Sequence, residues 1–141
     1  MTDGSLEPSA KEDRKSMRQK ILVVDDDGDC HEIVLQLRGL RYGIIQADSC
    51  AKGVQKAVSE TPDLIIMELG LGGVSGVEAT RWLKEDPRTK HIPIIVHTAS
   101  QEGSYTNKAL QAGAAEVLTK PVSTDVLEEA IQRSLKSSSQ P

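Results

Sequence analysis

The sequence predicts an α/β domain with a doubly wound, five-stranded parallel sheet. Two observations support this fold class. Short aliphatic runs recur five times along the 141 residues, and a stretch with helical spacing of its apolar residues follows each run. The connections are short, so each unit is expected to cross over in the right-handed sense that builds a parallel sheet with helices on both faces. The expected arrangement is a flavodoxin-like (βα)5 sheet of order 2-1-3-4-5, counted along the chain, with a cleft at the carboxyl ends of strands 1 and 3.

The first two strand–helix units follow a polar leader. Ile21–Val24 is an aliphatic run typical of a strand buried on both faces. A helix is expected from about Gly28, and Tyr42–Gly43 breaks it. Ile44–Ala47 then predicts the second strand, and the Ser49 hydroxyl is placed to cap the second helix.

The third and fourth units repeat the pattern. Leu64–Leu69 predicts a strand, and Ser75 is placed to cap the helix that follows it. Pro93–His97 predicts the fourth strand. A weaker helical pattern covers about Ser104–Ala112, and Gly113 is suited to a helix C-terminus because glycine tolerates left-handed backbone angles.

The fifth unit completes the domain. Glu116–Thr119 predicts a strand that is followed at once by Lys120-Pro121, and a last helix is expected from about Thr124 to Lys136. The predicted organisation is therefore a disordered leader over residues 1–19, one domain over 20–136 and a flexible tail over 137–141.

The composition excludes several classes of function. A formal net charge of -4 argues against direct nucleic-acid binding, which usually needs a basic face, and aromatic residues at 2% leave little surface for stacking bases. No apolar run approaches the roughly 18 residues that cross a bilayer, so we expect no membrane segment. The two cysteines, Cys30 and Cys50, are too few for a disulfide framework. A cytoplasmic location is expected.

Five residues at the predicted strand ends suggest phosphoryl chemistry. Asp25 and Asp26 follow the first strand, Glu68 ends the third, Thr98 follows the fourth and Lys120 follows the fifth. Carboxylates that crowd together repel one another, so such a site needs a cation. Oxygen ligands favour Mg²⁺, which commonly bridges carboxylates to a phosphoryl group, and a hydroxyl and an ammonium are suitable donors to phosphoryl oxygens.

At these residues the chain closely resembles the receiver domain of two-component response regulators. The resemblance covers about residues 20–136 in matching order and spacing. The matching segments are Lys20–Asp27, Pro62–Leu69, Ile92–Ala99 and Ala112–Pro121. It implies that Asp25, Asp26 and the carbonyl of Gly70 hold Mg²⁺, that Thr98 is the switch hydroxyl and that Lys120 faces the phosphate. It also implies a cis Lys120–Pro121 peptide bond.

Several positions depart from the family pattern. Glu68 stands where receivers carry the aspartate that accepts phosphate. Gly72 and Ser75 replace a usual proline and aspartate in the next loop. Val117 stands where many receivers place a Tyr or Phe that turns inward on activation.

Glutamate at position 68 predicts that ordinary phosphotransfer is lost or slow. The extra methylene moves the carboxylate by about 1.5 Å, and a misplacement of about 1 Å can cost about a hundredfold in rate. The longer side chain also reaches toward Lys120, where the phosphate would lie. We therefore expect a non-enzymatic signalling domain that acts through protein contacts without Asp phosphorylation.

Three alternatives stay open. Glu68 imitates the phosphorylated state and holds an active-like conformation, although a carboxylate carries less charge than a phosphoryl group. Glu68 itself accepts phosphate. The third alternative is a haloacid-dehalogenase-type phosphatase with Asp25 as nucleophile and Asp27 as acid/base. It lacks a later strand ending in the paired aspartates that such enzymes need.

The resemblance also suggests where partners bind. It implies contact with a sensor kinase or a downstream protein through the fourth helix, fifth strand and fifth helix, and it also allows a homodimer. In this chain that surface offers the polar residues Lys108, Gln111, Glu116, Glu128, Glu129 and Arg133. Trp82 lies beside the inner face of the third helix, where it either covers the edge of the core or contacts a partner.

Overall fold

The computed structural model describes residues 19–25, 30–70, 75–99 and 103–139. Its five parallel strands form one sheet of order β3-β2-β4-β5-β6, which is the expected 2-1-3-4-5 arrangement. The strands are β2 (Lys20–Val24), β3 (Gly43–Ala47), β4 (Leu64–Met67), β5 (Ile94–Thr98) and β6 (Glu116–Thr119). The helices are α2 (Cys30–Gly39), α3 (Cys50–Glu60), α4 (Gly76–Glu85), α5 (Gly103–Ala112) and α6 (Thr124–Ser139).

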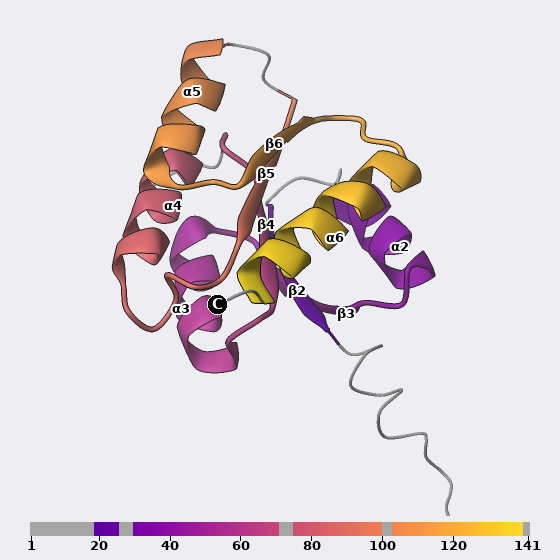
Figure 1. Ribbon diagram of the computed structural model, residues 1–141, viewed down its shortest axis with the longest axis horizontal. Coiled ribbons are helices and arrows are strands. Elements are labelled where there is room, and N and C mark those ends of the chain that lie inside the picture. The colour runs from indigo at the N-terminus through magenta and orange to yellow at the C-terminus, as the bar shows by residue number, and fades with distance from the viewer. Residues whose placement is uncertain (1–18, 26–29, 71–74, 100–102, 140–141) are drawn as a thin grey trace, which may run out of the picture.

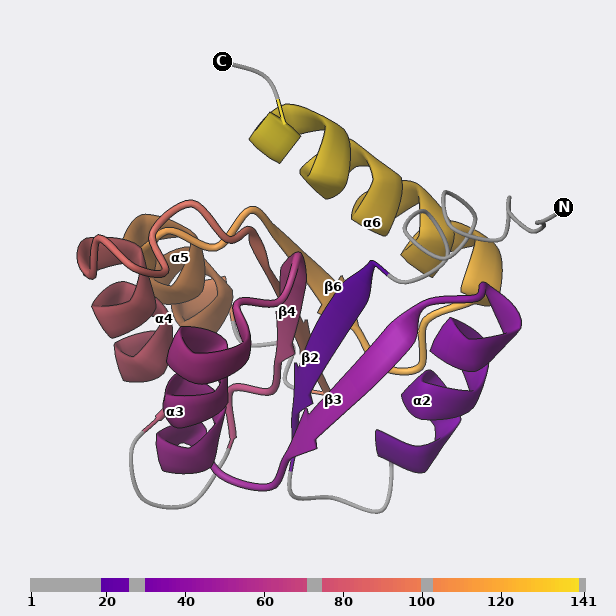
Figure 2. The same cartoon turned by 90° about the horizontal axis from the view of Figure 1, so that it is seen from below.

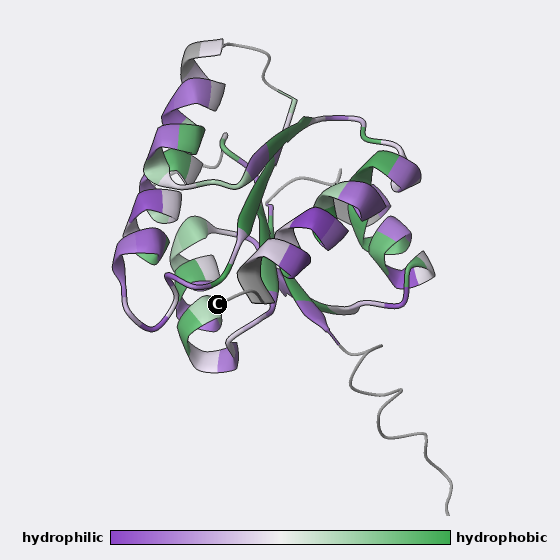
Figure 3. Cartoon of the chain, viewed as in Figure 1, coloured by the Kyte–Doolittle hydropathy of each residue, from purple (hydrophilic) through white to green (hydrophobic). Residues whose placement is uncertain are grey.

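Helices cover both faces of the sheet. Figure 1 shows α3, α4 and α5 on one side and α2 and α6 on the other, and Figure 2 shows the same division from a second direction. Successive residues of a strand point to opposite faces, so Leu22 and Val24 pack toward α3 and α4, while Ile21 and Val23 pack toward α2 and α6. Every residue of β4 and β5 is buried. These strands are among the strongly hydrophobic segments in Figure 3.

Two serines cap helices as predicted. The Ser49 hydroxyl accepts a hydrogen bond from the backbone N–H of Lys52 at 3.1 Å, and the Ser75 hydroxyl accepts one from Glu78 at 3.1 Å. Each bond satisfies a first-turn N–H that has no partner within its helix. These two caps fix where α3 and α4 begin.

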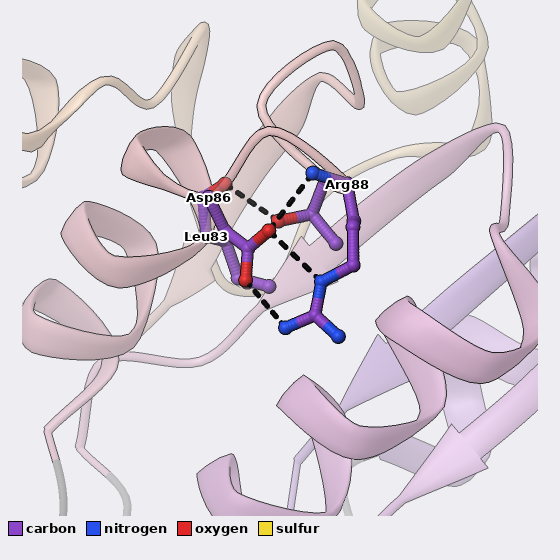
Figure 4. Close-up of polar contacts among 4 residues, drawn as sticks. Leu83, Asp86 and Arg88 are labelled. Atoms are coloured by element: carbon purple, nitrogen blue, oxygen red, sulfur yellow. Dashed lines mark hydrogen bonds and ion pairs between the residues drawn. The ribbon is translucent and has the colours of Figure 1, made fainter.

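The turn after α4 is held by its own side chains. Asp86 accepts hydrogen bonds from the backbone N–H of Arg88 at 2.8 Å and from the guanidinium at 2.8 and 3.1 Å (Figure 4). The buried Thr89 hydroxyl donates to the carbonyl of Leu83 at 2.7 Å, which satisfies a group at the helix end. This turn sets the direction in which the chain enters β5.

The ends of β4 and α6 differ from the sequence prediction by two and three residues. Strand β4 ends at Met67 rather than Leu69, because the chain turns where the Glu68 side chain bonds to the next backbone N–H groups. Helix α6 continues to Ser139, past the expected end at Lys136, because residues 137–139 are all serine and contain no glycine or proline to stop the helix. The leader over residues 1–18 lies outside the described part of the chain. Among the described helices, none is long and apolar enough to span a membrane.

Candidate functional site

The carboxyl ends of four strands deliver the candidate residues to one edge of the sheet. Asp25 follows β2, Glu68 follows β4, Thr98 ends β5 and Lys120 follows β6. Backbone hydrogen bonds continue past the strands and fix this alignment: the Glu68 N–H donates to Val24 at 3.0 Å, and the Lys120 N–H donates to Thr98 at 2.9 Å. The structure therefore brings together four of the predicted strand-end residues. Asp26, the fifth, lies outside the described residues.

The Lys120 ammonium lies between two carboxylates. Its Nζ atom is 2.9 Å from Asp25 Oδ2 and 2.8 Å from Glu68 Oε1. The side chains of Lys120, Asp25 and Glu68 are only 10%, 3% and 12% exposed. The predicted contact between Glu68 and Lys120 is confirmed, and the contact to Asp25 adds a second carboxylate to the same cation.

The second oxygen of Glu68 is bound to the backbone. Oε2 accepts the N–H of Leu69 at 2.8 Å and that of Gly70 at 3.0 Å, and the Thr98 hydroxyl also hydrogen-bonds to the Glu68 carboxylate. A carboxylate accepts hydrogen bonds only, so each of these donors matches it. The Glu68 carboxylate is therefore bound by four donors: the Thr98 hydroxyl, the Lys120 ammonium and the backbone N–H groups of Leu69 and Gly70.

The ionisation of the site follows from these contacts. Burial raises the pKa of the Glu68 carboxyl, but the hydrogen bonds from Lys120, Thr98 and Gly70 together with the Lys120 charge outweigh burial and leave that pKa below its ordinary value. Burial likewise lowers the pKa of Lys120, but the hydrogen bonds and charges of Glu68 and Asp25 raise it well above its ordinary value. Glu68 is thus an anion and Lys120 a cation at neutral pH.

Gly76 holds the Glu68 backbone closely, a role that the sequence prediction missed. A Cβ atom at this first residue of α4 would lie 2.4 Å from the Glu68 carbonyl oxygen and 2.8 Å from the Leu69 Cα atom. The Gly76 N–H also donates to the Leu69 carbonyl at 3.3 Å. Gly76 directly after the capping Ser75 is the sequence signal that could have indicated this close approach.

The loop that carries Lys120 is anchored to α2. The Lys120–Pro121 peptide bond is cis, as the resemblance implied. Gln36 donates from Nε2 to the carbonyl of Val122 at 2.8 Å and to the hydroxyl of Thr124 at 3.2 Å. These bonds hold the start of α6 against α2 and so position Lys120 over the sheet edge.

The predicted Mg²⁺ ligands are described only in part. Asp25 supplies a buried carboxylate and Gly70 a carbonyl next to Glu68, which are the oxygen donors that Mg²⁺ prefers. Asp26 is outside the described residues. Within the described ranges, no three His, Cys, Asp or Glu residues lie close enough to hold a metal ion together. The donors fit Mg²⁺ in kind, and the complete ligand set stays a prediction.

Val117 lies half-buried on β6 and packs against an aliphatic cluster beneath α4 and α5. The cluster consists of Leu69, Val77, Val96, Ala109, Ala112 and Ala114. Leu69 directly follows Glu68, so this cluster lies between the Glu68 backbone and Val117, the position at which many receivers carry the aromatic residue that turns inward on activation. An aliphatic side chain there gives no ring that can turn inward.

The expected partner surface carries a charged pair. Arg133 on α6 donates to Glu116 on β6 through Nε at 3.0 Å and through Nη2 at 2.8 Å. Four further polar residues of this surface, Lys108, Gln111, Glu128 and Glu129, lie on α5 and α6. Nothing in these contacts identifies a partner.

Comparison with known proteins gives one consistent family. The family model described as the response regulator receiver domain matches residues 21–132. Among curated proteins, the chain is 31% identical over 113 residues to the protein PilH of Pseudomonas aeruginosa, covering 79% of this chain and 93% of that protein. It is also 31% identical over 117 residues to the polar-differentiation response regulator DivK of Brucella ovis, covering 82% and 95%. It spans only 45% of another relative, the phosphate regulon transcriptional regulatory protein PhoB of P. aeruginosa.

Solved structures agree with this assignment. A response regulator from Chloroflexus aurantiacus superposes with a TM-score of 0.79 at 30% identity, covering 84% of this chain and 98% of that one. The receiver domain of a sensor histidine kinase from P. aeruginosa superposes with a TM-score of 0.78 at 28% identity, with the same coverage, and holds a magnesium ion in its active-site cleft.

Proposed function

This chain belongs to the response regulator receiver family of two-component signalling, and on that premise we propose that it is an atypical receiver that signals through protein contacts without ordinary phosphorylation. The chain has no catalytic activity of its own in this proposal. The domain acts in the cytoplasm and engages a sensor kinase or a downstream signalling protein through α5, β6 and α6. The phosphatase alternative is set aside, because the matched family is that of receivers.

The observation that carries the proposal is that the Lys120 ammonium is already bound by the Glu68 carboxylate. Glu68 Oε1 lies 2.8 Å from the ammonium, and Oε2 accepts two backbone N–H groups. An incoming phosphoryl group would need the same ammonium and the same Thr98 hydroxyl. Phosphorylation of Glu68 would have to break these contacts first, and the extra methylene would misplace the attacking oxygen, at a cost of about a hundredfold in rate per 1 Å.

Mg²⁺ is part of the proposal as a bound ion. Asp25, Asp26 and the Gly70 carbonyl would hold it, and it would supply charge neutralisation for the crowded carboxylates. The related kinase receiver with a magnesium ion in its cleft supports this expectation by similarity. Without the ion, the chain itself holds the Asp25 and Glu68 carboxylates in place through their ion pairs with the Lys120 ammonium.

A second candidate, an active-like receiver, is favoured by Thr98. Its hydroxyl is hydrogen-bonded to Glu68, as a switch hydroxyl would be to a phosphoryl group. The two candidates differ in how α5 and β6 respond to the Glu68 charge. Under the active-like candidate, Glu68→Gln shifts backbone amide resonances across α5 and β6. Under the phosphorylation-independent proposal, the shifts stay within the loops next to residue 68.

A labelling experiment tests the proposal. The protein is incubated with a small acyl-phosphate donor and Mg²⁺ and then weighed by intact mass spectrometry. We expect no phosphoryl adduct on the wild-type chain and one phosphoryl group on Glu68→Asp, because the shorter side chain releases Lys120 and restores the acceptor position. Glu68→Gln is the control without a nucleophile. A stable adduct on wild-type Glu68 would contradict the proposal, and an unlabelled Glu68→Asp would show that the loop or metal site has also diverged.

A further inference from the structure

An apolar hollow lies between α3 and α4, away from the surface expected to bind partners. It has a volume of about 360 Å³ and is lined by Cys50, Ala51, Val54, Glu78, Ala79 and Trp82. Only Glu78 among these residues is charged. Figure 1 shows α3 and α4 side by side on one face of the sheet, opposite α6.

Trp82 lines both this hollow and a second one. The residue is 49% exposed, so about half of this residue, which has the largest side chain in the protein, faces solvent. It also lines a neighbouring hollow of about 500 Å³ with Glu85, Asp86, Pro87 and Arg88. A half-exposed tryptophan between two hollows is typical of an anchor for a partner, because Trp is enriched among the residues that dominate binding energy. Covering the edge of the core, the first of the two roles considered for Trp82, therefore accounts for only half of its surface.

Two glutamates flank Trp82 along one face of α4. Glu78, Trp82 and Glu85 recur at helical spacing and span about 10 Å at the usual rise per residue. Neither glutamate takes part in an ion pair within the part of the chain that the structure describes. Both carboxylates are therefore available to a cationic partner.

The cations near these glutamates leave them exposed to solvent. Lys84 donates to the carbonyl of Ile92 at 2.8 Å, and Arg88 is bound to Asp86 at 2.8 Å. Arg81, the residue before Trp82, forms no ion pair with either glutamate within the described residues. On the α4 side of the hollow, Glu78, Trp82 and Glu85 thus form an acidic–aromatic–acidic stripe. On the α3 side, the hollow is lined by Ala51 and Val54.

From this arrangement we propose that the α3–α4 groove binds a basic amphipathic helix of a partner protein. One or two aliphatic side chains of that helix fill the hollow beside Trp82. Lys or Arg residues about one turn to either side bind Glu78 and Glu85, and a cation also packs on the indole face. The groove is a second docking surface, separate from α5, β6 and α6. The proposal does not depend on the state of Glu68, so the phosphoryl-labelling result leaves it unaffected.

The lone tryptophan provides the assay. Because Trp82 is the one Trp in the sequence, its emission reports directly on the groove. The probe is a synthetic helical peptide with Lys at positions i and i+7 and Leu at i+3 and i+4, and the comparison peptide carries Glu in place of Lys. We expect saturable quenching or a blue shift of the Trp82 emission with the Lys peptide alone, and weaker binding as salt is added.

Variants locate the binding. Glu78→Lys/Glu85→Lys should weaken binding of the Lys peptide by about tenfold or more, and Trp82→Ala should do the same when the binding of a dye-labelled peptide is followed by anisotropy. The matched control is Asp125→Lys/Glu129→Lys, which makes the same charge change on exposed positions of α6 and should leave the affinity unchanged. Circular dichroism of each variant verifies that it is folded.

Three results would overturn the proposal. The first is equal affinity for the Lys and Glu peptides, or an equal loss in the α4 and α6 charge variants. The second is a Trp82 emission that changes with protein concentration alone, which would make a second copy of the chain the occupant. The third is a groove that binds the Lys peptide only after residues 1–18 are removed, which would make that segment the occupant.

Discussion

Replacing Lys120 with methionine tests the charge balance of the site. Methionine keeps most of the apolar stem but removes the cation that lies within 2.9 Å of both Asp25 and Glu68. Two carboxylates that are 3% and 12% exposed then face each other without their partner. Breaking a buried ion pair by removing one partner typically costs about 3–5 kcal/mol. Because Glu68 and Lys120 retain an edge to water, we take the lower end, about 3 kcal/mol.

Urea unfolding at pH 7, followed by Trp82 fluorescence and circular dichroism, measures this loss. In thermal unfolding of a domain of this size, the same loss of about 3 kcal/mol corresponds to a fall of about 12 °C in Tm, at about 4 °C per kcal/mol. Lys56→Met is the matched control, because Lys56 donates only to the Gln46 carbonyl on an exposed surface, and it should cost less than about 1 kcal/mol. Adding Glu68→Gln to Lys120→Met should recover part of the loss by removing one uncompensated charge.

A Lys120→Met protein within about 0.5 kcal/mol of the wild type, the range of ordinary surface substitutions, would refute this reasoning. It would mean that the carboxylates find another source of neutralisation. A Glu68→Gln/Lys120→Met protein that is no more stable than Lys120→Met alone would show that Glu68 does not carry the unpaired charge.

Three further predictions concern neighbouring features. Gly76→Ala should destabilise the domain by about 1–3 kcal/mol in urea unfolding, because its Cβ atom would lie 2.4 Å from the Glu68 carbonyl oxygen; an unchanged midpoint would show that α4 can shift freely. Arg88 lowers the pKa of Asp86 to about 2 from 3.8, so this contribution to stability is present above about pH 4 and is lost as pH falls toward 2. Asp86→Asn should therefore flatten that part of the acid-unfolding curve, and an unaltered curve would contradict the assignment. Arg133→Gln should change stability by less than about 1 kcal/mol, because its ion pair is largely exposed; a larger loss would show that the pair holds α6 in place.

Much of the fold could be predicted because it depends on local patterns. The aliphatic runs and the capping residues Ser49 and Ser75 located the elements. Right-handed crossovers indicated a parallel sheet covered on both faces, and the expected strand order was that of a doubly wound sheet. Element ends were less predictable. Strand β4 stops at Met67 because of a hydrogen bond from the Leu69 backbone to the Glu68 side chain, and no propensity scale contains such a bond.

The site was predictable in its membership and in the contact between Glu68 and Lys120, but not in the second contact of Lys120, to Asp25. Strand ends meet at one edge of a parallel sheet, so Asp25, Glu68 and Lys120 were expected together. That Lys120 bridges both carboxylates depends on side-chain lengths and on the path of the loop after β6. The hollow beside Trp82 depends on how α3 lies against α4, which no spacing along the chain reveals.

Lys120 holds the Glu68 carboxylate, and the pKa of Glu68 measures that contact directly. A lowered folded-state pKa means that the contact contributes stability above pH 4.5 and loses it as pH falls through the folded-state value. Titration of the Glu68 side-chain carbon by NMR should therefore give a pKa below 4.5 in the wild type. In Lys120→Met the pKa should lie above that value, because burial then outweighs the remaining hydrogen bonds. A wild-type pKa at or above 4.5, unchanged in Lys120→Met, would show that Lys120 does not hold the Glu68 carboxylate.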